Sequence, residues 1–422
     1  MLMRSSGPRL VVCCAVLLAM TRVQAGPPAE SQLLARARAL TRRSALVDGH
    51  NDYPWALREK ARGDLSLLDI SKPQPTIMTD IPRLRAGGVG AQFWSVYVPV
   101  ELAGQAAVTA TLEQIDIVHR MVQRYPETFE LAGSADDVER IFRKGRIASL
   151  IGMEGGYSID NSLGALRMFQ RLGARYMTLT HSKNTAWADS ATDDPKLGGL
   201  SPFGEEVVRE MNRLGMLVDL SHVSPDTMDD AIRVSRAPVI FSHSSARALT
   251  EVPRDVPDSI LQRLRENGGV VMVTFVPGFL SPAVAAWNRL QSAEQTRLTA
   301  QLPGDPQAVA AGVKAWTAAN PAPRATLVEA ADHIDHIRDT AGIDHIGLGG
   351  DFDGIESVVQ GLEDVSTYPA LLAELLRRGY TDEDVRKIAG KNILRVMREA
   401  EKVSAALRAE RGPSMLLFEP PK

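Results

Sequence analysis

Residues 216–243, MLVDLSHVSPDTMDDAIRVSRAPVIFSH, contain two short apolar runs that each end in a histidine, His222 and His243. Short apolar runs bounded by turn-forming residues are typical of buried β-strands. In a parallel α/β barrel the carboxyl ends of the strands share one face, and that face carries the chemistry. The two histidines are therefore expected to lie side by side on such a face.

The same pattern recurs along the whole chain of 422 residues. Apolar runs also end at or next to His50 and Asp52, Glu154, His181 and Asp351. In all, the sequence predicts eight strands, at residues 44–50, 89–98, 147–154, 175–181, 216–222, 238–243, 269–275 and 345–351. This repetition predicts more about the protein than any one of the runs alone.

Helical patterns such as FGEEVVREMNRLG lie between or after these runs, and Gly173 and Gly215 close two of them directly before the next strand. Eight strand–helix units predict the α/β class and a TIM (β/α)8 barrel, which we expect to form a single domain over residues 26–422. The alternative, an open doubly wound sheet, would lead us to expect a glycine-rich phosphate loop after an early strand, and the sequence has none.

Charge favours a small ligand as the partner. The chain has 48 basic and 51 acidic residues, a formal net charge of -3 and no long block of like charge. Nothing in this balance predicts binding to nucleic acid or to a membrane surface.

The first 25 residues predict a signal peptide. Arg4 and Arg9 precede the apolar run LVVCCAVLLAM, and the small residues before Gly26 suit cleavage after Ala25. The run is too short to span a bilayer. Its Cys13 and Cys14 are the only cysteines, so the exported chain is expected to lack disulfides and thiolate ligands. We expect a periplasmic or secreted protein without a membrane anchor; a lipoprotein modified at Cys13 is a weaker alternative.

Two regions depart from the rhythm of strands and helices. Residues 281–324 are rich in Ala, Gln and Pro and predict two extra helices inserted after the seventh strand. On the catalytic face they could act as a lid or as the contact of a homodimer. The tail after Ala406 shows no periodicity, and no element is predicted there.

Five of the polar residues at the strand ends have the chemistry of metal ligands. His50 and Asp52 are two positions apart and can grip one cation together, while His222 and His243 face a second. Glu154 ends a buried run, where an unpaired carboxylate is costly, and its two oxygens can bridge ions about 3.5–4 Å apart. The sequence thus predicts two divalent ions, with the bridging Glu154 as part of the catalytic set. Their excess positive charge would lower the pKa of a bridging water.

Three polar residues remain for substrate and proton handling. His181 could hydrogen-bond a developing oxyanion, or it could merely cap its strand. Asp351 could accept the proton of water and pass it to the leaving amine, with Asp353, expected to point the same way, as its rival. Arg254, in the loop after the sixth strand, could clamp a substrate carboxylate. A structural role is expected for the other histidines, His119, His333, His336 and His345.

At this point the residues resemble a known family. The segments that carry the resemblance include HNDYPW, PRLRAGGVGAQFWSVY, SLIGMEGG, YMTLTHSKNTAWAD, DLSHVS, APVIFSHSSARAL and GGDFDG. They are similar to the membrane dipeptidases, also called renal or microsomal dipeptidases, over about residues 44–397. The resemblance implies an amidohydrolase-like barrel and a dipeptidase with two zinc ions. It also implies tolerance of a C-terminal D-residue and opening of some β-lactams.

The residues that the resemblance implies for the site are the same as those predicted from their positions at the strand ends. The implied zinc ligands are His50, Asp52, Glu154, His222 and His243. The implied substrate contacts are His181 and Arg254, with Asp351 as the acid/base residue. Vertebrate members of the family are lipid-anchored and disulfide-linked. We do not expect either property here, because the sequence shows no hydrophobic C-terminal tail and no cysteine after residue 14.

Two alternatives stay open at this stage. Another binuclear barrel hydrolase, such as a lactonase, phosphotriesterase or cyclic amidase, commonly bridges its metals with a carbamylated lysine at the fourth strand end. Here that end carries His181, and Lys183 follows two residues later. A periplasmic binding protein or an inactive scaffold with structural metals is the other alternative. Asp351 argues against it, because such a protein needs no proton shuttle.

Overall fold

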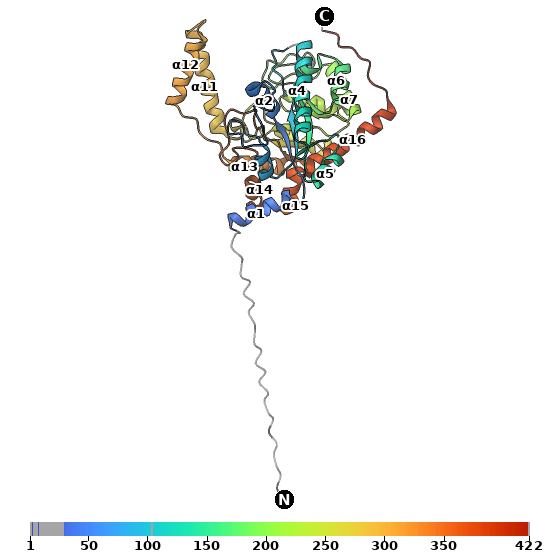
Figure 1. Ribbon diagram of the computed structural model, residues 1–422, viewed down its shortest axis with the longest axis vertical. Helices are drawn as coiled ribbons and strands as arrows, with labels where there is room; N and C mark the ends of the chain where they lie inside the picture. Colours follow the sequence, from blue (N-terminus) through green and yellow to red (C-terminus); the bar gives the residue numbers. More distant parts are fainter. Residues whose placement is uncertain (1, 3–6, 8–28, 103, 421–422) are drawn as a thin grey trace.

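The computed structural model describes residues 2, 7, 29–102 and 104–420 (Figure 1). The predicted signal peptide lies outside the described residues apart from Leu2 and Gly7. Among the residues that are described, no helix combines the length and the apolar character needed to cross a membrane.

Eight parallel strands close into a barrel, which confirms the predicted TIM fold. Around the barrel the order is β2-β1-β9-β8-β7-β6-β5-β4, and β4 pairs back to β2. The strands are β1 (Leu46–Asn51), β2 (Val89–Ser95), β3 (Phe129–Leu131), β4 (Ile147–Glu154), β5 (Ala174–Thr178), β6 (Leu217–Asp219), β7 (Ile240–Ser244), β8 (Val270–Val273) and β9 (Ile346–Leu348). Each of the eight predicted strands overlaps one strand of the barrel.

The three-residue strand β3 was not predicted. It pairs with the first half of β4, where Phe129 lies opposite Ile147, while β5 pairs with the second half, where Glu154 lies opposite Thr178. The strand β3 thus extends one edge of β4 below the point where β5 begins, and the barrel itself still has eight strands.

Helices surround the barrel (Figure 1). They are α1 (Glu30–Thr41), α2 (Tyr53–Ala61), α3 (Ile81–Gly87), α4 (Gln105–Arg124), α5 (Ala135–Arg143), α6 (Leu163–Arg171), α7 (Pro202–Leu214), α8 (Pro225–Val234), α9 (Asp258–Asn267), α10 (Pro277–Leu280), α11 (Pro282–Gln301), α12 (Pro306–Ala319), α13 (Leu327–Thr340), α14 (Tyr368–Arg377), α15 (Asp382–Arg386) and α16 (Asn392–Glu410). Short 3₁₀ turns lie at Gly156–Ile159 and Ile343–His345, and a π-turn lies at Lys387–Lys391.

Local sequence explains the helix ends. At the start of α7, the side chain of Ser201 accepts the N–H of Gly204 and Pro202 occupies the first turn. At its end, Gly215 takes the left-handed conformation with φ of 71°, which a residue without Cβ adopts at little cost. The chain can therefore turn directly from α7 into β6.

The helices α11 and α12 form a hairpin that projects from the barrel (Figure 1). Trp287 of α11 and Trp316 of α12 pack against each other with ring centroids 5.6 Å apart. No described residue of α12 is buried, whereas Val284 and Ala285 near the start of α11 are. Only the base of the hairpin is therefore part of the barrel's core.

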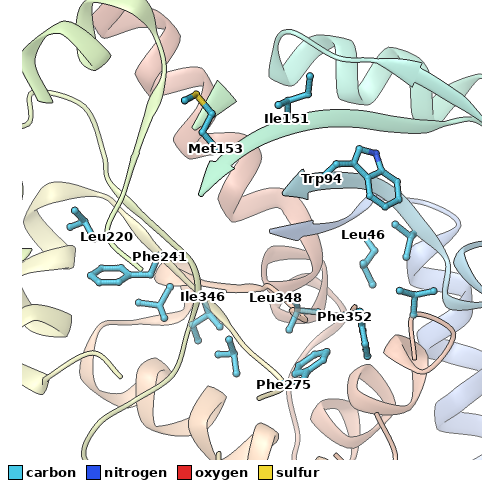
Figure 2. Packing of buried hydrophobic residues seen from close by; sticks show 14 of the residues in the cluster. Leu46, Trp94, Ile151, Met153, Leu220, Phe241, Phe275, Ile346, Leu348 and Phe352 are labelled. Atoms are coloured by element: carbon cyan, nitrogen blue, oxygen red, sulfur yellow. The ribbon is translucent and has the colours of Figure 1, made fainter. Parts of the chain in front are cut away.

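The hydrophobic core consists of two clusters on opposite faces of the barrel wall. One contains Leu46, Trp94 and Ile151 and packs against the helices (Figure 2). The other contains Val47 and Phe93, their direct neighbours along the same strands. Because successive strand residues point to opposite faces, the strand residues of the second cluster face the barrel interior. The same cluster also includes residues of α5 and α16, such as Ile141 and Ile393.

Five strands, β2, β5, β6, β8 and β9, end two or three residues earlier than the sequence predicts, and for β6 and β9 the backbone gives the reason. The strand β6 stops at Asp219 and β9 at Leu348, whereas runs up to His222 and Asp351 were expected. His222 has φ of 69° and Asp351 has φ of 60°, and a residue in the left-handed region cannot continue a strand. Both side chains are therefore presented by loops beyond the strand ends.

Candidate metal centre and active site

The five residues proposed as metal ligands converge above the carboxyl ends of the strands. Glu154 lies at their centre: its Oε1 is 3.0 Å from Nε2 of His222 and 3.4 Å from Nε2 of His243. Its Oε2 is 3.4 Å from Nε2 of His50, which is itself 3.2 Å from Oδ2 of Asp52. The two oxygens of one carboxylate thus face different histidines, and the rings of His50 and His243 also lie close together, with centroids 3.9 Å apart.

The orientation of His50 depends on Tyr176 inside the barrel. The Tyr176 hydroxyl lies 2.8 Å from Nδ1 of His50 and donates to the carbonyl of Gly49 at 3.2 Å. Because that hydroxyl has a single proton, Nδ1 of His50 must be the donor in the first contact. Nε2 of His50 then presents its lone pair to Asp52 and Glu154, which is the state a metal ligand requires.

Gly152 makes this arrangement sterically possible. A Cβ at position 152 would lie 2.0 Å from Cζ of Tyr176, far closer than any real contact. The tyrosine ring therefore fills the space that a side chain at position 152 of β4 would take, two residues before Glu154.

His243 is held by a chain of hydrogen bonds that ends on a buried carboxylate. The hydroxyl of Ser242 donates to Oδ2 of Asp219 at 2.6 Å and lies 2.8 Å from Nδ1 of His243. With its proton given to Asp219, Ser242 can only accept from His243, so Nδ1 carries the proton and Nε2 is free. Asp219 also accepts the hydroxyl of Thr178 at 2.6 Å.

The strained conformation of His222 is supported through its carbonyl oxygen. That oxygen accepts the N–H of Ala191 at 2.8 Å and the hydroxyl of Thr180 at 3.1 Å. The hydroxyl of Ser190 lies 3.3 Å away and donates to the carbonyl of His181 at 2.6 Å. Two donors on one carbonyl fix the backbone of a residue whose φ is otherwise unfavourable. The ring of His222 is therefore aimed at Glu154 by its surroundings.

The residues present suit divalent cations. Nε2 of His50 is buried without a hydrogen-bond partner while facing two carboxylates. Burial would lower the pKa of His50, but Tyr176, Glu154 and Asp52 outweigh it and raise the pKa well above its usual value. The site therefore favours a positive charge at this point, which a cation bound between the carboxylates and Nε2 would supply.

The second group of ligands is neutral. Burial and the charge of Arg254 hold the pKa of both His222 and His243 well below the usual value. Burial would raise the pKa of Glu154, but His50 and the two other histidines lower it well below its ordinary range. An ionised bridge between neutral imidazoles is the donor set that zinc prefers.

Asp351 and Asp353 have different surroundings, contrary to the expectation that they point the same way. Asp351 offers an oxygen within 4.8 Å of ligand atoms of His50 and Asp52. Asp353 instead accepts the N–H of Met78 at 2.6 Å. Burial and neighbouring carboxylates raise the pKa of Asp351 well above its usual value, and burial raises the pKa of Asp353 to about 6. The expectation assumed an ideal strand, in which residues two apart point the same way, but both residues have positive φ and lie beyond the end of β9.

His181 and Arg254 border the same centre. Nε2 of His181 lies 3.7 Å from Glu154, and burial lowers its pKa, so the ring is neutral. Arg254 is only 6% exposed. Its guanidinium donates to the carbonyl of His243 at 3.3 Å and lies over the ring of Phe279 at 5.3 Å. Among the described residues it forms no ion pair with a carboxylate.

Lys183 does not join the centre. Its side chain is 62% exposed and pairs with Asp193 at 3.2 Å. The four histidines expected to be structural do not line the cavity of the site; His333, for example, bonds the backbone of Ala246 and Leu280. A bridging carbamylated lysine therefore has no support in this geometry.

A cavity of about 840 Å³ opens over the cluster. Its wall includes Glu154, His181, His222, His243, Arg254, Asp351 and Asp353, and also Trp55, Tyr97, Phe279, Val284 and Asn288. Its size accommodates a small peptide.

Sequence reasoning missed the residues that orient the ligands. Asp219 lies in the buried run MLVDLSH, and the argument applied to Glu154, that a buried carboxylate needs a partner, would have identified it. Tyr176 carried no such signal, because a tyrosine in an apolar run is ordinary core composition. Ser95, which donates to Oε2 of Glu154 at 3.1 Å, was equally invisible.

Comparisons with known proteins identify the family of the chain. Residues 34–411 match the family described as membrane dipeptidase, peptidase family M19. The chain is 43% identical to dipeptidase tcpJ of Claviceps purpurea over 370 residues, 85% of this chain and 78% of that one.

Two solved structures extend the comparison. The probable dipeptidase PvdM of Pseudomonas aeruginosa is 27% identical with a TM-score of 0.77, covering 88% of this chain and 99% of that one. A metallo peptidase from Rhodobacter sphaeroides, liganded with a phosphinate mimic of the dipeptide L-Ala-D-Ala, is 25% identical with a TM-score of 0.70. It is matched over 85% of this chain and 99% of its own length.

Proposed function

This chain belongs to the membrane dipeptidase family, peptidase family M19, and is a metallo-dipeptidase; we propose that it cleaves dipeptides with two zinc ions. The proposed ligands are His50 and Asp52 for one ion, His222 and His243 for the other, and Glu154 for both. When bound, such a pair of ions would polarise the scissile carbonyl and lower the pKa of a water molecule between them.

The proposal that the substrate is a dipeptide depends on the burial and charge of Arg254. Its guanidinium is buried beside the ligand cluster, keeps its charge and has no carboxylate partner within the described chain. A buried charge without a counter-ion is costly, so a ligand that brings a carboxylate would be favoured. We propose that Arg254 binds the free C-terminal carboxylate of the substrate, which explains why a dipeptide would be preferred to a long chain.

Asp351 is proposed to move the proton. Burial next to carboxylates raises its pKa, and its position near His50 and Asp52 places it beside the proposed ions. There it would accept the proton of the attacking water and give it to the leaving amine. Asp353 is assigned no part in this step, because its Oδ1 accepts the N–H of Met78 and it belongs to no group of candidate ligands among the described residues. His181, neutral and at the edge of the cluster, would donate a hydrogen bond to the developing oxyanion.

Dipeptides with a C-terminal D-residue are part of the proposed substrate range. Support comes from the Rhodobacter sphaeroides relative, whose bound ligand mimics L-Ala-D-Ala. Export to the periplasm or the medium is also proposed, on the composition of residues 1–25.

The test combines metal analysis with turnover. The purified protein is expected to hydrolyse Gly-D-Ala and Gly-L-Ala, and to lose this activity with chelator and regain it with zinc. It should hydrolyse the C-terminal amides of the same dipeptides far more slowly. Equal turnover of acids and amides would remove the reason for assigning Arg254 to the carboxylate.

A further inference from the structure

The helix α11 reaches into the cavity at its base. Val284 and Asn288 both line the cavity, and they are four positions apart, so they share one face of the helix. Val284 is 6% exposed and forms the lower part of the cavity wall that α11 contributes. Asn288 lies at the rim, and in the described part of the chain its amide makes no hydrogen bond to another residue.

This wall lies next to the proposed carboxylate clamp. Phe279, which stacks on Arg254 at 5.3 Å, belongs to α10, the short helix that leads into α11. The amide of Asn288 lies against α10: a Cβ on Gly278 would be 2.5 Å from its Nδ2. Gly278 therefore allows the amide to pack on the backbone directly beside Phe279.

His333 ties the wall and the clamp together. Its Nδ1 accepts the N–H of Ala246, in the loop between β7 and Arg254, and its Nε2 donates to the carbonyl of Leu280 at the end of α10. One buried side chain thus links the segment before Arg254 to the segment before α11. The distance between the clamp and the wall is set by the fold.

We propose that Val284 and Asn288 form the subsite for the side chain of the C-terminal residue of the dipeptide, and that Asn288 selects a polar, uncharged side chain there. The proposal rests on the proposed function, in which Arg254 holds the carboxylate of that same residue. The side chain next to this carboxylate must lie close to Arg254, and the contact of Phe279 with Arg254 places the part of the cavity wall formed by α10 and α11 beside it. An amide can both donate to and accept from such a side chain.

The test is a panel of dipeptides assayed with the zinc-loaded, full-length enzyme and its Asn288→Leu variant. For each enzyme, kcat/KM for Gly-Asn is divided by kcat/KM for Gly-Leu. This ratio should be about 5-fold higher in the parent than in Asn288→Leu, the value of one hydrogen bond. The ratio for Asn-Gly over Leu-Gly should stay within about 2-fold, because the N-terminal residue lies outside this subsite. In a second variant, Val284→Ala, the ratio of kcat/KM for Gly-Phe to that for Gly-Ala should be higher than in the parent, because the shorter side chain leaves more room in the subsite.

Leu290→Ala is the matched control, since Leu290 is on the same helix but 61% exposed and outside the cavity. It should leave all ratios unchanged. Unchanged ratios in both Asn288→Leu and Val284→Ala, or changes confined to the N-terminal residue, would overturn the subsite while dipeptidase action stands. A parent that hydrolyses none of these dipeptides would overturn the subsite and the proposed function together.

Discussion

The Nε2 atoms of His222 and His243 lie 2.8 Å apart, in rings whose pKa values are both held well below the usual value. Nδ1 of His243 carries its proton toward Ser242, so its Nε2 lone pair points at His222. Two neutral imidazoles aimed at one point, 3.0 and 3.4 Å from the same Glu154 oxygen, would supply two nitrogen ligands to the second of the proposed ions.

Metal content is the first prediction. Glu154→Gln removes the negative charge of the bridge and keeps its size, so zinc content should fall from about two ions per chain and activity should be lost. Elemental analysis after dialysis gives the count. Glu113→Gln, a carboxylate 56% exposed on α4, should keep the parent's zinc. Full activity with a single tightly held ion would contradict the bridging role.

The second prediction concerns Arg254. Arg254→Ala should raise KM for dipeptides by at least about tenfold, because the charge-assisted contacts to the substrate carboxylate are lost, while zinc content stays normal. Steady-state kinetics and metal analysis provide the two readouts. Arg263→Ala, at a half-exposed surface arginine on α9, serves as control. An unchanged KM in Arg254→Ala would show that the carboxylate is bound elsewhere.

Most of the barrel could be predicted, because each strand is a short apolar run that ends in a polar residue. The strand β3 could not, since its three residues include the charged Glu130 and resemble a loop. The ends of β6 and β9 were placed too late because sequence does not reveal that His222 and Asp351 have positive φ. The polar residues at the strand ends were accessible by the same reasoning.

The residues that orient those polar side chains were harder to predict from the sequence. Tyr176 contacts His50 across 126 positions of sequence, and its neighbours in the chain give no hint of that partner. The contrast between Asp351 and Asp353 was missed for a related reason. The loop geometry that turns Asp353 toward Met78 depends on a contact 275 residues away.

The third prediction separates these two aspartates. Asp351→Asn keeps shape and removes the base, so kcat should fall by about 10²–10⁴ with near-normal zinc content. Asp353→Asn should cost much less in kcat, and mainly reduce stability through the contact with Met78. Rapid kinetics and thermal melts on both variants check this. A dead Asp353→Asn beside an active Asp351→Asn would reverse the assignment.

Tyr176 provides the fourth prediction. Tyr176→Phe keeps the ring against Gly152 but removes the hydroxyl that accepts from His50, so zinc affinity should fall about 10–100-fold. Competition with a chromogenic chelator measures the affinity. The metal-free variant should melt near the metal-free parent, because the packing is unchanged. A large loss of stability with unaltered affinity would assign Tyr176 to the core alone.

The fifth prediction is a pH dependence of stability from His333. Burial lowers its pKa from 6.5 to about 4, so folding favours the neutral ring. This contribution is fully present above pH 6.5 and is lost as the pH falls from 6.5 toward 4, by at most about 3 kcal/mol. Urea denaturation of the metal-free protein at several pH values gives the slope. In His333→Gln the slope in this window should be shallower, and equal slopes would contradict the prediction.

The close contact of Gly152 with Tyr176 also constrains how such sequences can diverge. Any side chain at position 152 would overlap the tyrosine ring, and loss of the ring leaves a void beneath the proposed metal site. A substitution at position 152 or 176 alone would therefore cost stability or the contact to His50. Among descendants of this sequence, the two positions should therefore change together, and a larger residue at 152 should mark lineages in which His50 has acquired a different hydrogen-bond acceptor.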